Sequence, residues 1–314
     1  MRADHRRTLR RSVAAVAVLS SLAAARGASA ADAVVPGDFE TIAQALAGAS
    51  DADGDGVLSV LVRAGLTKER VVIERSSSSL TAEPGAFLSG GIVIRGASDV
   101  TVEGFAVVPG FESDGIAVID SERVRLVGNV VADARRGIVV DGGSGAVLVS
   151  NDVKNCARSG IRVGGGAASA FLSKNRAHDN RRHGFDVVGA AGALLVDNTA
   201  DGNLGHGFRV GKAAFAKLVE NASFGNRLSG FVVASADSPL VESNAAKGNG
   251  ANGLRLLESP RAVVARNVAT ANRAYGLRAS AGDGADFDAL PGVAGAPPGD
   301  NVLEGNGLGE ARID

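Results

Sequence analysis

Five charged or titratable residues in the middle of the chain have types and spacing that could support a reaction. They are His183, His206, Asp186, Arg162 and Arg209. Arginine binds and neutralises a carboxylate, and histidine or aspartate can take or return a proton near neutral pH. We therefore predict that these five residues form a catalytic site for an anionic substrate. The simpler interpretation is a solvated surface of paired charges, which contributes little stability per exposed pair.

The histidines also allow a metal site. His178 precedes His183 by one turn, and with His206 and a carboxylate these side chains could hold a transition metal. Soft ligands for copper are nearly absent, because the chain has one methionine and one cysteine. The single cysteine, Cys156, excludes an intrachain disulfide, and its place in an inward-facing column predicts a buried thiol.

Two acidic segments are candidates for a hard cation such as Ca²⁺. Residues 51–56 read Asp-Ala-Asp-Gly-Asp-Gly, but Val62 stands at the twelfth position, where a calcium-binding loop needs a bidentate glutamate. An acidic turn is therefore the favoured interpretation. Near the C-terminus, Asp283, Asp286 and Asp288 could gather around Ca²⁺ as a metal site, with a solvated loop as the simpler alternative.

A sequence repeat in steps of 22 to 24 residues would position the candidate side chains. A fixed period in this range is typical of a solenoid or an array, in which each repeat packs on the next. One column of glycines marks the repeat: Gly115, Gly137, Gly160, Gly184, Gly207, Gly230, Gly253 and Gly276. A column of asparagines keeps the same step: Asn129, Asn151, Asn175, Asn198, Asn221, Asn244 and Asn267.

Each repeat contains three short strands. After a marker glycine, apolar residues occupy alternate positions, as Phe208 and Val210 do, which is the pattern of a strand with one buried face. A second strand precedes the marker asparagine and a third follows it, which leaves no room for crossover helices. We predict an all-β fold, a single right-handed parallel β-helix of about ten coils with a short N-terminal capping helix. A leucine-rich repeat is the alternative, but its leucine and asparagine spacing is absent.

The asparagine column requires hydrogen bonds, because a buried amide is costly without a partner. Asparagines stacked in successive coils can bond to one another and to turn carbonyls. A second column follows five residues later: Asn180, Asn203, Asn226, Asn249 and Asn272. Ala134 and Cys156 occupy it in two earlier coils, so we expect this second ladder to be incomplete there. We predict that both columns are structural, and that the marker glycines serve a positive φ or a close backbone approach.

The first 30 residues have the features of an export signal. A basic, arginine-rich start is followed by an apolar run at 13–25 and by Ala28-Ser29-Ala30, an A-x-A cleavage pattern. We predict a signal peptide at 1–30 and a secreted or periplasmic protein. Ordinary secretion is favoured, although Arg6-Arg7 also fits a twin-arginine signal.

Charge and hydropathy limit the kinds of partner that the exported chain could bind. Removal of residues 1–30 leaves 27 basic and 33 acidic residues, a net charge of −6. This acidic balance without clustered aromatic residues argues against nucleic acid as a partner. No later apolar run is long enough for a membrane span.

We divide the rest of the chain into an N-terminal cap, residues 31–56, and a β-helix, residues 57–314. In the cap, Thr41 and Gln44 fit a capping box that begins a short helix. Such a helix would cover the open end of the first coil, where unpaired strand edges invite aggregation.

The repeat is interrupted near the C-terminus. Asn301 follows Asn267 by 34 residues rather than by one repeat, and Asn306 restores the five-residue spacing. We therefore predict a loop insertion at 282–299, in a stretch rich in glycine, proline and aspartate.

The repeats from Val34 to Asn306 resemble those of the pectin-lyase-like superfamily. That superfamily includes pectate lyases, mannuronan C5-epimerases and the accessory β-helix protein of nitrous-oxide reductase. Residues 183–186, His-Gly-Phe-Asp, are similar to the start of the epimerase motif Y-G-F-D-P-H, and Val187-Val188 stands where the motif has Pro-His. The resemblance implies a site that holds the carboxylate of a uronate with a cation and exchanges the proton at C5.

The predicted function is to bind or modify an extracellular acidic polysaccharide. The alternative is a non-catalytic scaffold or accessory protein of the cell envelope, and the sequence leaves open whether the protein is an enzyme. Aromatic platforms for sugars are scarce, since there is no tryptophan and the one tyrosine is Tyr275. Phe224 is the best candidate for an exposed aromatic side chain.

Overall fold

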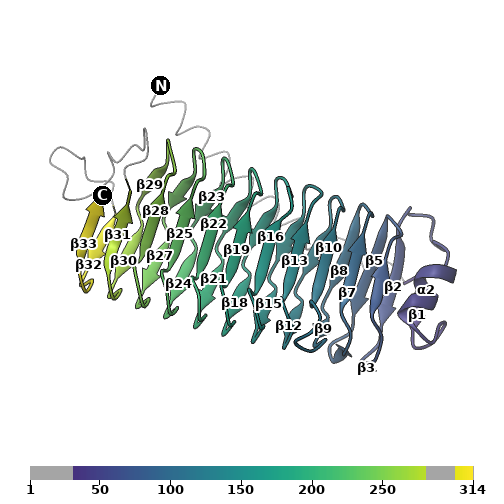
Figure 1. Cartoon of the computed structure of the whole chain (residues 1–314). Helices are drawn as coiled ribbons and strands as arrows, with labels where there is room; N and C mark the ends of the chain where they lie inside the picture. The colour runs from purple at the N-terminus through teal and green to yellow at the C-terminus, as the bar shows by residue number, and fades with distance from the viewer. Residues whose placement is uncertain (1–30, 281–300, 314) are drawn as a thin grey trace. The chain divides into compact units, whose positions relative to one another are not determined.

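The computed structural model describes residues 31–280 and 301–313, and within them the chain forms a right-handed parallel β-helix. Three sheets of eleven strands each run along the stack, so the fold has about eleven coils (Figure 1). The predicted architecture is confirmed. The predicted signal peptide at 1–30 and the loop at 282–299, with Asp283, Asp286 and Asp288, lie outside the described residues.

From β2 to β31, each coil contributes one strand to each sheet, in the order sheet A, sheet B, sheet C. Sheet A consists of β1 (Ala33–Val35), β2 (Leu58–Val62), β5 (Ser78–Ala82), β8 (Val100–Glu103), β11 (Arg125–Val127), β14 (Val147–Val149), β17 (Phe171–Ser173), β20 (Leu194–Val196), β23 (Lys217–Val219), β26 (Leu240–Glu242) and β29 (Val263–Ala265). Sheet B consists of β3 (Gly65–Thr67), β6 (Ala86–Leu88), β9 (Ala106–Val107), β12 (Val130–Ala132), β15 (Asp152–Lys154), β18 (Arg176–His178), β21 (Thr199–Asp201), β24 (Ala222–Phe224), β27 (Ala245–Lys247), β30 (Val268–Thr270) and β32 (Val302–Glu304). Sheet C consists of β4 (Val71–Ile73), β7 (Ile92–Arg95), β10 (Ile116–Ile119), β13 (Ile138–Asp141), β16 (Ile161–Gly164), β19 (Phe185–Val188), β22 (Phe208–Gly211), β25 (Phe231–Ala234), β28 (Leu254–Leu257), β31 (Tyr275–Ala279) and β33 (Gly309–Ile313).

The apolar residues that follow the marker glycines line the interior of the stack. Phe185, Phe208 and Phe231 occupy this position in three consecutive coils and are at most 1% exposed. Their rings stack with centroids 4.6 and 4.7 Å apart. Burial of one such side chain contributes about 1.5–3 kcal/mol, so the column fixes the register of sheet C in these coils.

Two asparagine ladders run through the interior at the turns. Nδ2 of Asn221 donates to Oδ1 of Asn244 at 3.0 Å and to the carbonyl of Leu195 at 2.9 Å, and the same Oδ1 accepts from the backbone amide of Asn221. The ladder continues from Asn267 to Asn301 across the 34-residue interval. The predicted ladders are confirmed.

The second ladder begins where the sequence predicts. Its first asparagine, Asn180, accepts a hydrogen bond from the backbone amide of Cys156 at 3.0 Å. It then continues through Asn203 as far as Asn306. Cys156 is fully buried, and burial raises the pKa of its thiol to about 12, so the thiol is inert.

The marker glycines are required by close approach of neighbouring coils rather than by a positive φ. A Cβ added to Gly207 would lie 2.8 Å from the carbonyl oxygen of Gly230 and would also overlap the hydroxyl of Ser223. A Cβ added to Gly230 would lie 2.8 Å from the carbonyl oxygen of Gly253. Of the two reasons predicted for this column, the structure supports the second.

The one helix among the described residues, α2 (Ile42–Gly48), lies at the N-terminal end, in contact with β1, β2 and β4 (Figure 1). The predicted capping box is present, since the hydroxyl of Thr41 accepts from the amide of Gln44. The carboxylate of Glu69 accepts from the amides of Ile42 and Ala43, which satisfies two further donors at the helix start. No helix among the described residues has the length and apolar character to cross a membrane.

Candidate functional site on the outer face of sheet C

Three of the predicted site residues lie in register on the outward side of sheet C. Arg162 on β16 pairs with Asp186 on β19, which pairs with Arg209 on β22. The Asp186 carboxylate accepts from Arg209 Nη1 at 2.8 Å and lies 3.4 Å from Arg162 Nη1. The Asp186 side chain is only 2% exposed, whereas the two arginines are 39% and 32% exposed. The Asp186 side chain therefore lies beneath two cations, and each of its oxygens contacts one of them.

The other two predicted residues, His183 and His206, stack at the corner that leads into sheet C. Their ring centroids are 5.2 Å apart and the planes differ by 7°. Nδ1 of His183 accepts from the amide of His206 at 3.1 Å, and Nδ1 of His206 accepts from the amide of Ser229 at 3.1 Å. A backbone amide can only donate, so each Nδ1 carries the lone pair and each neutral ring carries its proton on Nε2.

Both histidines favour the neutral form. Burial lowers the pKa of His183 to about 4, with the charges of His206 and Arg182 acting in the same direction against the opposing effect of Asp186. Burial also lowers the pKa of His206 to about 4, and the positive charge of Arg255 adds to the effect. Near neutral pH the pair therefore presents two neutral Nε2–H donors rather than two cations.

The predicted residues thus meet on one face, but the atoms that could accept a proton from a substrate are already hydrogen-bonded. The Nδ1 lone pairs of His183 and His206 are used by backbone amides, and the Asp186 carboxylate is used by two arginines. What remains for a ligand is a set of hydrogen-bond donors. Such a set suits recognition of an anion better than removal of a proton.

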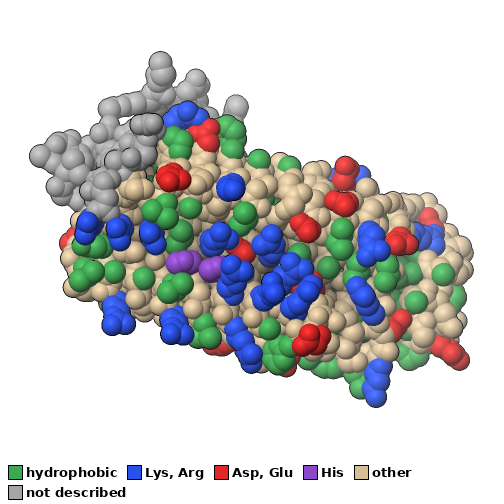
Figure 2. Space-filling model, viewed as in Figure 1, with side chains coloured by type: hydrophobic (Ala, Val, Ile, Leu, Met, Phe, Trp, Pro, Cys, Tyr) green, Lys and Arg blue, Asp and Glu red, His purple; other side chains and the backbone are tan. Residues whose placement is uncertain are grey.

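Sequence reasoning missed Arg255 as a site residue. Arg255 on β28 follows Arg209 and the buried Val232 in the same outward column. Its Nε is buried and has no hydrogen-bond partner. Arg278 on β31 comes next in register. Figure 2 shows lysine and arginine side chains gathered around the histidines on this face. The signal was present in the repeat, because Arg255 and Arg278 occupy the same repeat position as Arg209.

Phe111 is a second residue that the sequence did not single out. It is 39% exposed, and the guanidinium of Arg181 lies over its ring, 5.2 Å from the centroid.

Nearby in sequence, Asp114 accepts hydrogen bonds from Arg135 and Arg136. Burial opposes ionisation of Asp114, but the two guanidiniums outweigh it and lower the pKa of this carboxyl to about 2.

His178 does not join the other two histidines. It lies at the end of β18 in sheet B, where Nδ1 contacts Asp179 at 2.7 Å and Nε2 contacts Asp152 at 3.1 Å. Both ring nitrogens are therefore engaged by carboxylates. Across residues 31–280 and 301–313, no close group of three potential metal ligands includes a histidine, so the three-histidine metal site is not formed.

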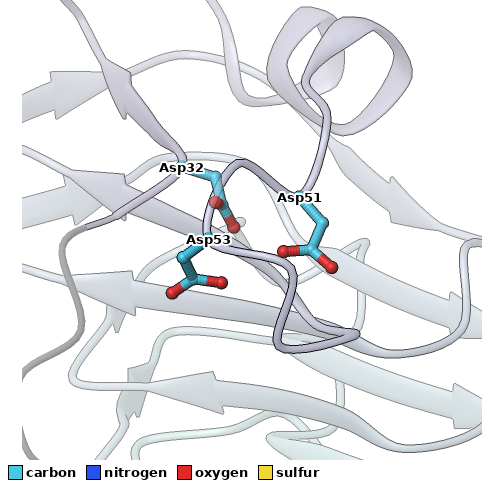
Figure 3. Close-up of side chains that lie close together, drawn as sticks. All are labelled: Asp32, Asp51 and Asp53. Carbon is cyan, nitrogen blue, oxygen red and sulfur yellow. The ribbon is translucent and has the colours of Figure 1, made fainter.

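The one close group of potential metal ligands in the described chain is Asp32, Asp51 and Asp53 (Figure 3). Their ligand atoms lie within 4.8 Å of one another. The oxygens of Asp51 accept from the amides of Gly54 and Gly56, each at 2.8 Å, and those of Asp32 accept from two further amides. These hydrogen bonds give the carboxylates a role in holding the acidic turn.

Comparison with known proteins agrees with this architecture. The family described as right handed beta helix region matches residues 59–171 and 114–289. No curated protein matches the sequence. The A-module of the Azotobacter vinelandii mannuronan C-5 epimerase AlgE4 is similar, with 16% identity, a TM-score of 0.62, and coverage of 92% of this chain and 96% of that chain.

Two further solved structures have a similar fold. One is a double mutant of the periplasmic alginate epimerase AlgG, with 15% identity, a TM-score of 0.61, and coverage of 82% of this chain and 74% of that chain. The other is PfbA, a surface adhesin of Streptococcus pneumoniae, with 13% identity, a TM-score of 0.52, and coverage of 72% and 71%. At these identities the likeness concerns the fold alone. With a family match that spans well over half of its residues, the chain belongs to the right-handed β-helix family.

Proposed function

We propose that this chain is a secreted or periplasmic protein that binds an acidic polysaccharide along the outer face of sheet C. The observation that carries the proposal is the register of Arg162, Arg209, Arg255 and Arg278 beside the two stacked histidines. Strands in successive coils are about 4.8 Å apart, which is close to the length of one sugar residue. In this column the arginines recur at intervals of one or two coils, which suits a polymer that carries negative groups at a regular spacing.

Two further facts support a polyanion as the ligand. The chain as a whole is not basic, with 33 basic and 34 acidic residues, so the arginine-rich face is a local feature. The fold is also shared with the alginate epimerases AlgE4 and AlgG, which act on an acidic polysaccharide. We favour binding over turnover because the described oxygens and nitrogens that could accept a proton here are already hydrogen-bonded.

The test is calorimetric titration of the purified protein with a polyuronate oligosaccharide and, separately, with a neutral glucan of equal length. We expect the polyuronate to bind with an affinity that falls as salt rises, and the glucan not to bind. The double variant Arg209→Met with Arg255→Met should lose most of the affinity. The matched control, Arg125→Met with Lys217→Met, removes two cations from sheet A and should bind like the wild type.

A scaffold without a glycan ligand is the competing function. It would be indicated if no acidic glycan bound the wild-type protein, or if the sheet A control lost as much affinity as the sheet C variant. In the second case the attraction would come from basic side chains spread over the surface rather than from a defined face.

The same residues provide the test for an enzyme. A lyase or an epimerase acting at His183, His206, Asp186, Arg162 and Arg209 would turn over a polyuronate. A lyase forms an unsaturated product that absorbs in the ultraviolet, and an epimerase exchanges the C5 proton with solvent deuterium. His183→Ala and Arg209→Ala should then each abolish turnover, and activity that survives both would place the chemistry elsewhere.

A further inference from the structure

In three coils, the residue before the marker glycine supports the next coil through a side-chain acceptor. His183 and His206 accept the amide of the following coil through Nδ1. Asn252 occupies the same repeat position and accepts the amide of Tyr275 through Oδ1 at 3.2 Å. An asparagine can therefore take over the bond to the next coil, because its Oδ1 accepts the backbone amide that the histidine accepts through Nδ1. Its own donor, Nδ2, is bonded to Cγ and does not extend as far outward as the histidine Nε2–H.

Apart from the Asp186 carboxylate, which two arginines already engage, the groups around the outward Nε2–H of the two histidines are hydrogen-bond donors. The Nε2–H groups of His183 and His206 are neutral donors, and the guanidinium of Arg255 has five N–H donors and no acceptor. Beyond Asp186, the outward column of sheet C reads Arg209, Val232, Arg255 and Arg278, with no carboxylate among them. Arg255 also retains a buried Nε–H without a partner, which is a costly arrangement, so its Nε ties the guanidinium to no acceptor within the protein.

We infer that the Nε2–H edges of His183 and His206 and the guanidinium of Arg255 form one subsite for a fully ionised oxyanion, a carboxylate or a sulfate ester on a sugar. This inference rests on the proposed function for the nature of the polymer, but the subsite itself is defined by the three side chains. A sugar hydroxyl suits it poorly, because a hydroxyl must donate as well as accept. An oxyanion only accepts and can use every donor present.

The inference predicts an unusual dependence on pH. A site that bound anions through imidazolium would lose affinity as the pH rose through the ordinary histidine pKa near 6.5. Here the rings already bind as neutral donors at neutral pH, because burial holds the pKa of each near 4. We expect the affinity to change by less than about twofold between pH 5.5 and pH 8.

The experiment uses protein labelled with ¹⁵N at histidine and observes the ring nitrogens by NMR. The probes are D-glucuronate, glucose 6-sulfate and glucose. We expect the Nε2 resonances of His183 and His206 to shift on titration with glucuronate or with the sulfate ester, and not with glucose. The anion with the lower Kd, fitted from the titration curves, is the preferred oxyanion.

Two variants test the assignment. His206→Asn keeps the backbone acceptor, as Asn252 does, and replaces the outward Nε2–H with an amide donor that lies one bond closer to the backbone. Arg255→Met removes the cation with its orphan donor. Each should weaken binding of the preferred anion by about threefold to tenfold. Lys217→Met, which removes a cation from sheet A, should leave the affinity unchanged.

The outcomes separate this inference from the proposed function. If the small anions bind as described but no polymer does, the subsite stands and the polysaccharide proposal fails. If a polymer binds and both His206→Asn and Arg255→Met bind it like the wild type, the subsite is wrong and the polysaccharide proposal survives. If neither small anions nor polymers bind, or if the ring protons lie on Nδ1, the inference is overturned.

Discussion

Asp186 and Arg209 lie on neighbouring strands and are joined by a 2.8 Å hydrogen bond from Nη1 to a carboxylate that is almost completely buried. The second cation, Arg162, lies farther away at 3.4 Å. Loss of the closer partner leaves a buried charge with one weak contact. We expect Arg209→Met to lower the free energy of unfolding by about 1–3 kcal/mol, and Arg162→Met by less than about 1 kcal/mol. Denaturant titration measures both, and equal losses would show that the two arginines share the carboxylate evenly.

The stacked histidines make stability depend on pH. The folded-state pKa of His183 and of His206 is lowered from 6.5 to about 4, so between these values the unfolded chain binds more protons than the folded one. Stability from the pair is fully present above pH 6.5 and is lost as the pH falls toward 4. We expect the thermal midpoint of the wild type to fall through this window. The double variant His183→Asn with His206→Asn should fall less, and parallel curves for the two proteins would contradict the prediction.

The asparagine ladder should be sensitive to single truncations. Asn221→Ala or Asn244→Ala removes hydrogen bonds to the neighbouring coils and leaves buried partners unsatisfied. Each should lower the free energy of unfolding by about 1–3 kcal/mol. The control is Lys247→Ala, which truncates an exposed side chain at the end of β27 and should cost less than about 0.5 kcal/mol. Unchanged midpoints for both ladder variants would mean that solvent reaches the column.

Two glycines at opposite ends of one strand should respond differently to the same substitution. Gly207→Ala places a Cβ against the carbonyl of Gly230 and the hydroxyl of Ser223. Gly211→Ala, at the end of β22, meets its nearest neighbour at an ordinary 3.6 Å. We expect the first variant to lose about 2–4 kcal/mol and the second to stay within about 1 kcal/mol of the wild type. Thermal unfolding of the pair provides the measurement, and similar midpoints would show that the coils can move apart.

The architecture could be predicted from the sequence because the same demand recurs in every coil. A buried amide needs a partner, and Asn221 finds one in Asn244 only if the repeat length is constant. A tight corner excludes side chains, and Gly207 therefore recurs as Gly230. Positions that meet the same structural requirement in every coil have the same residue type in every repeat, so they can be recognised in a single sequence.

The candidate site was only partly predictable, because its chemistry depends on relations that do not repeat. The register placed Asp186 beside Arg209, and the structure confirms that placement. Which nitrogen of His206 carries the proton follows from the amide of Ser229, a contact that spacing alone does not reveal. The orphan Nε of Arg255 could not be foreseen, since it reflects the packing of one side chain.

The cluster of carboxylates at the acidic turn was also predictable only in part. The spacing of Asp51 and Asp53 was visible in the sequence, whereas the approach of Asp32 depends on how β1 joins sheet A. That strand lies inside the segment predicted as a cap. A local motif therefore acquired its third member from a tertiary contact.

The exchange of histidine for asparagine at the corner position has a consequence for how such a protein can change over time. Support of the next coil asks only for an acceptor close to the backbone, which His206 and Asn252 both supply. The side-chain atoms beyond that acceptor do not take part in supporting the next coil. A lineage of these chains can therefore vary the corner residue of one coil without disturbing its neighbours, and a recognition surface can be assembled or dismantled one coil at a time.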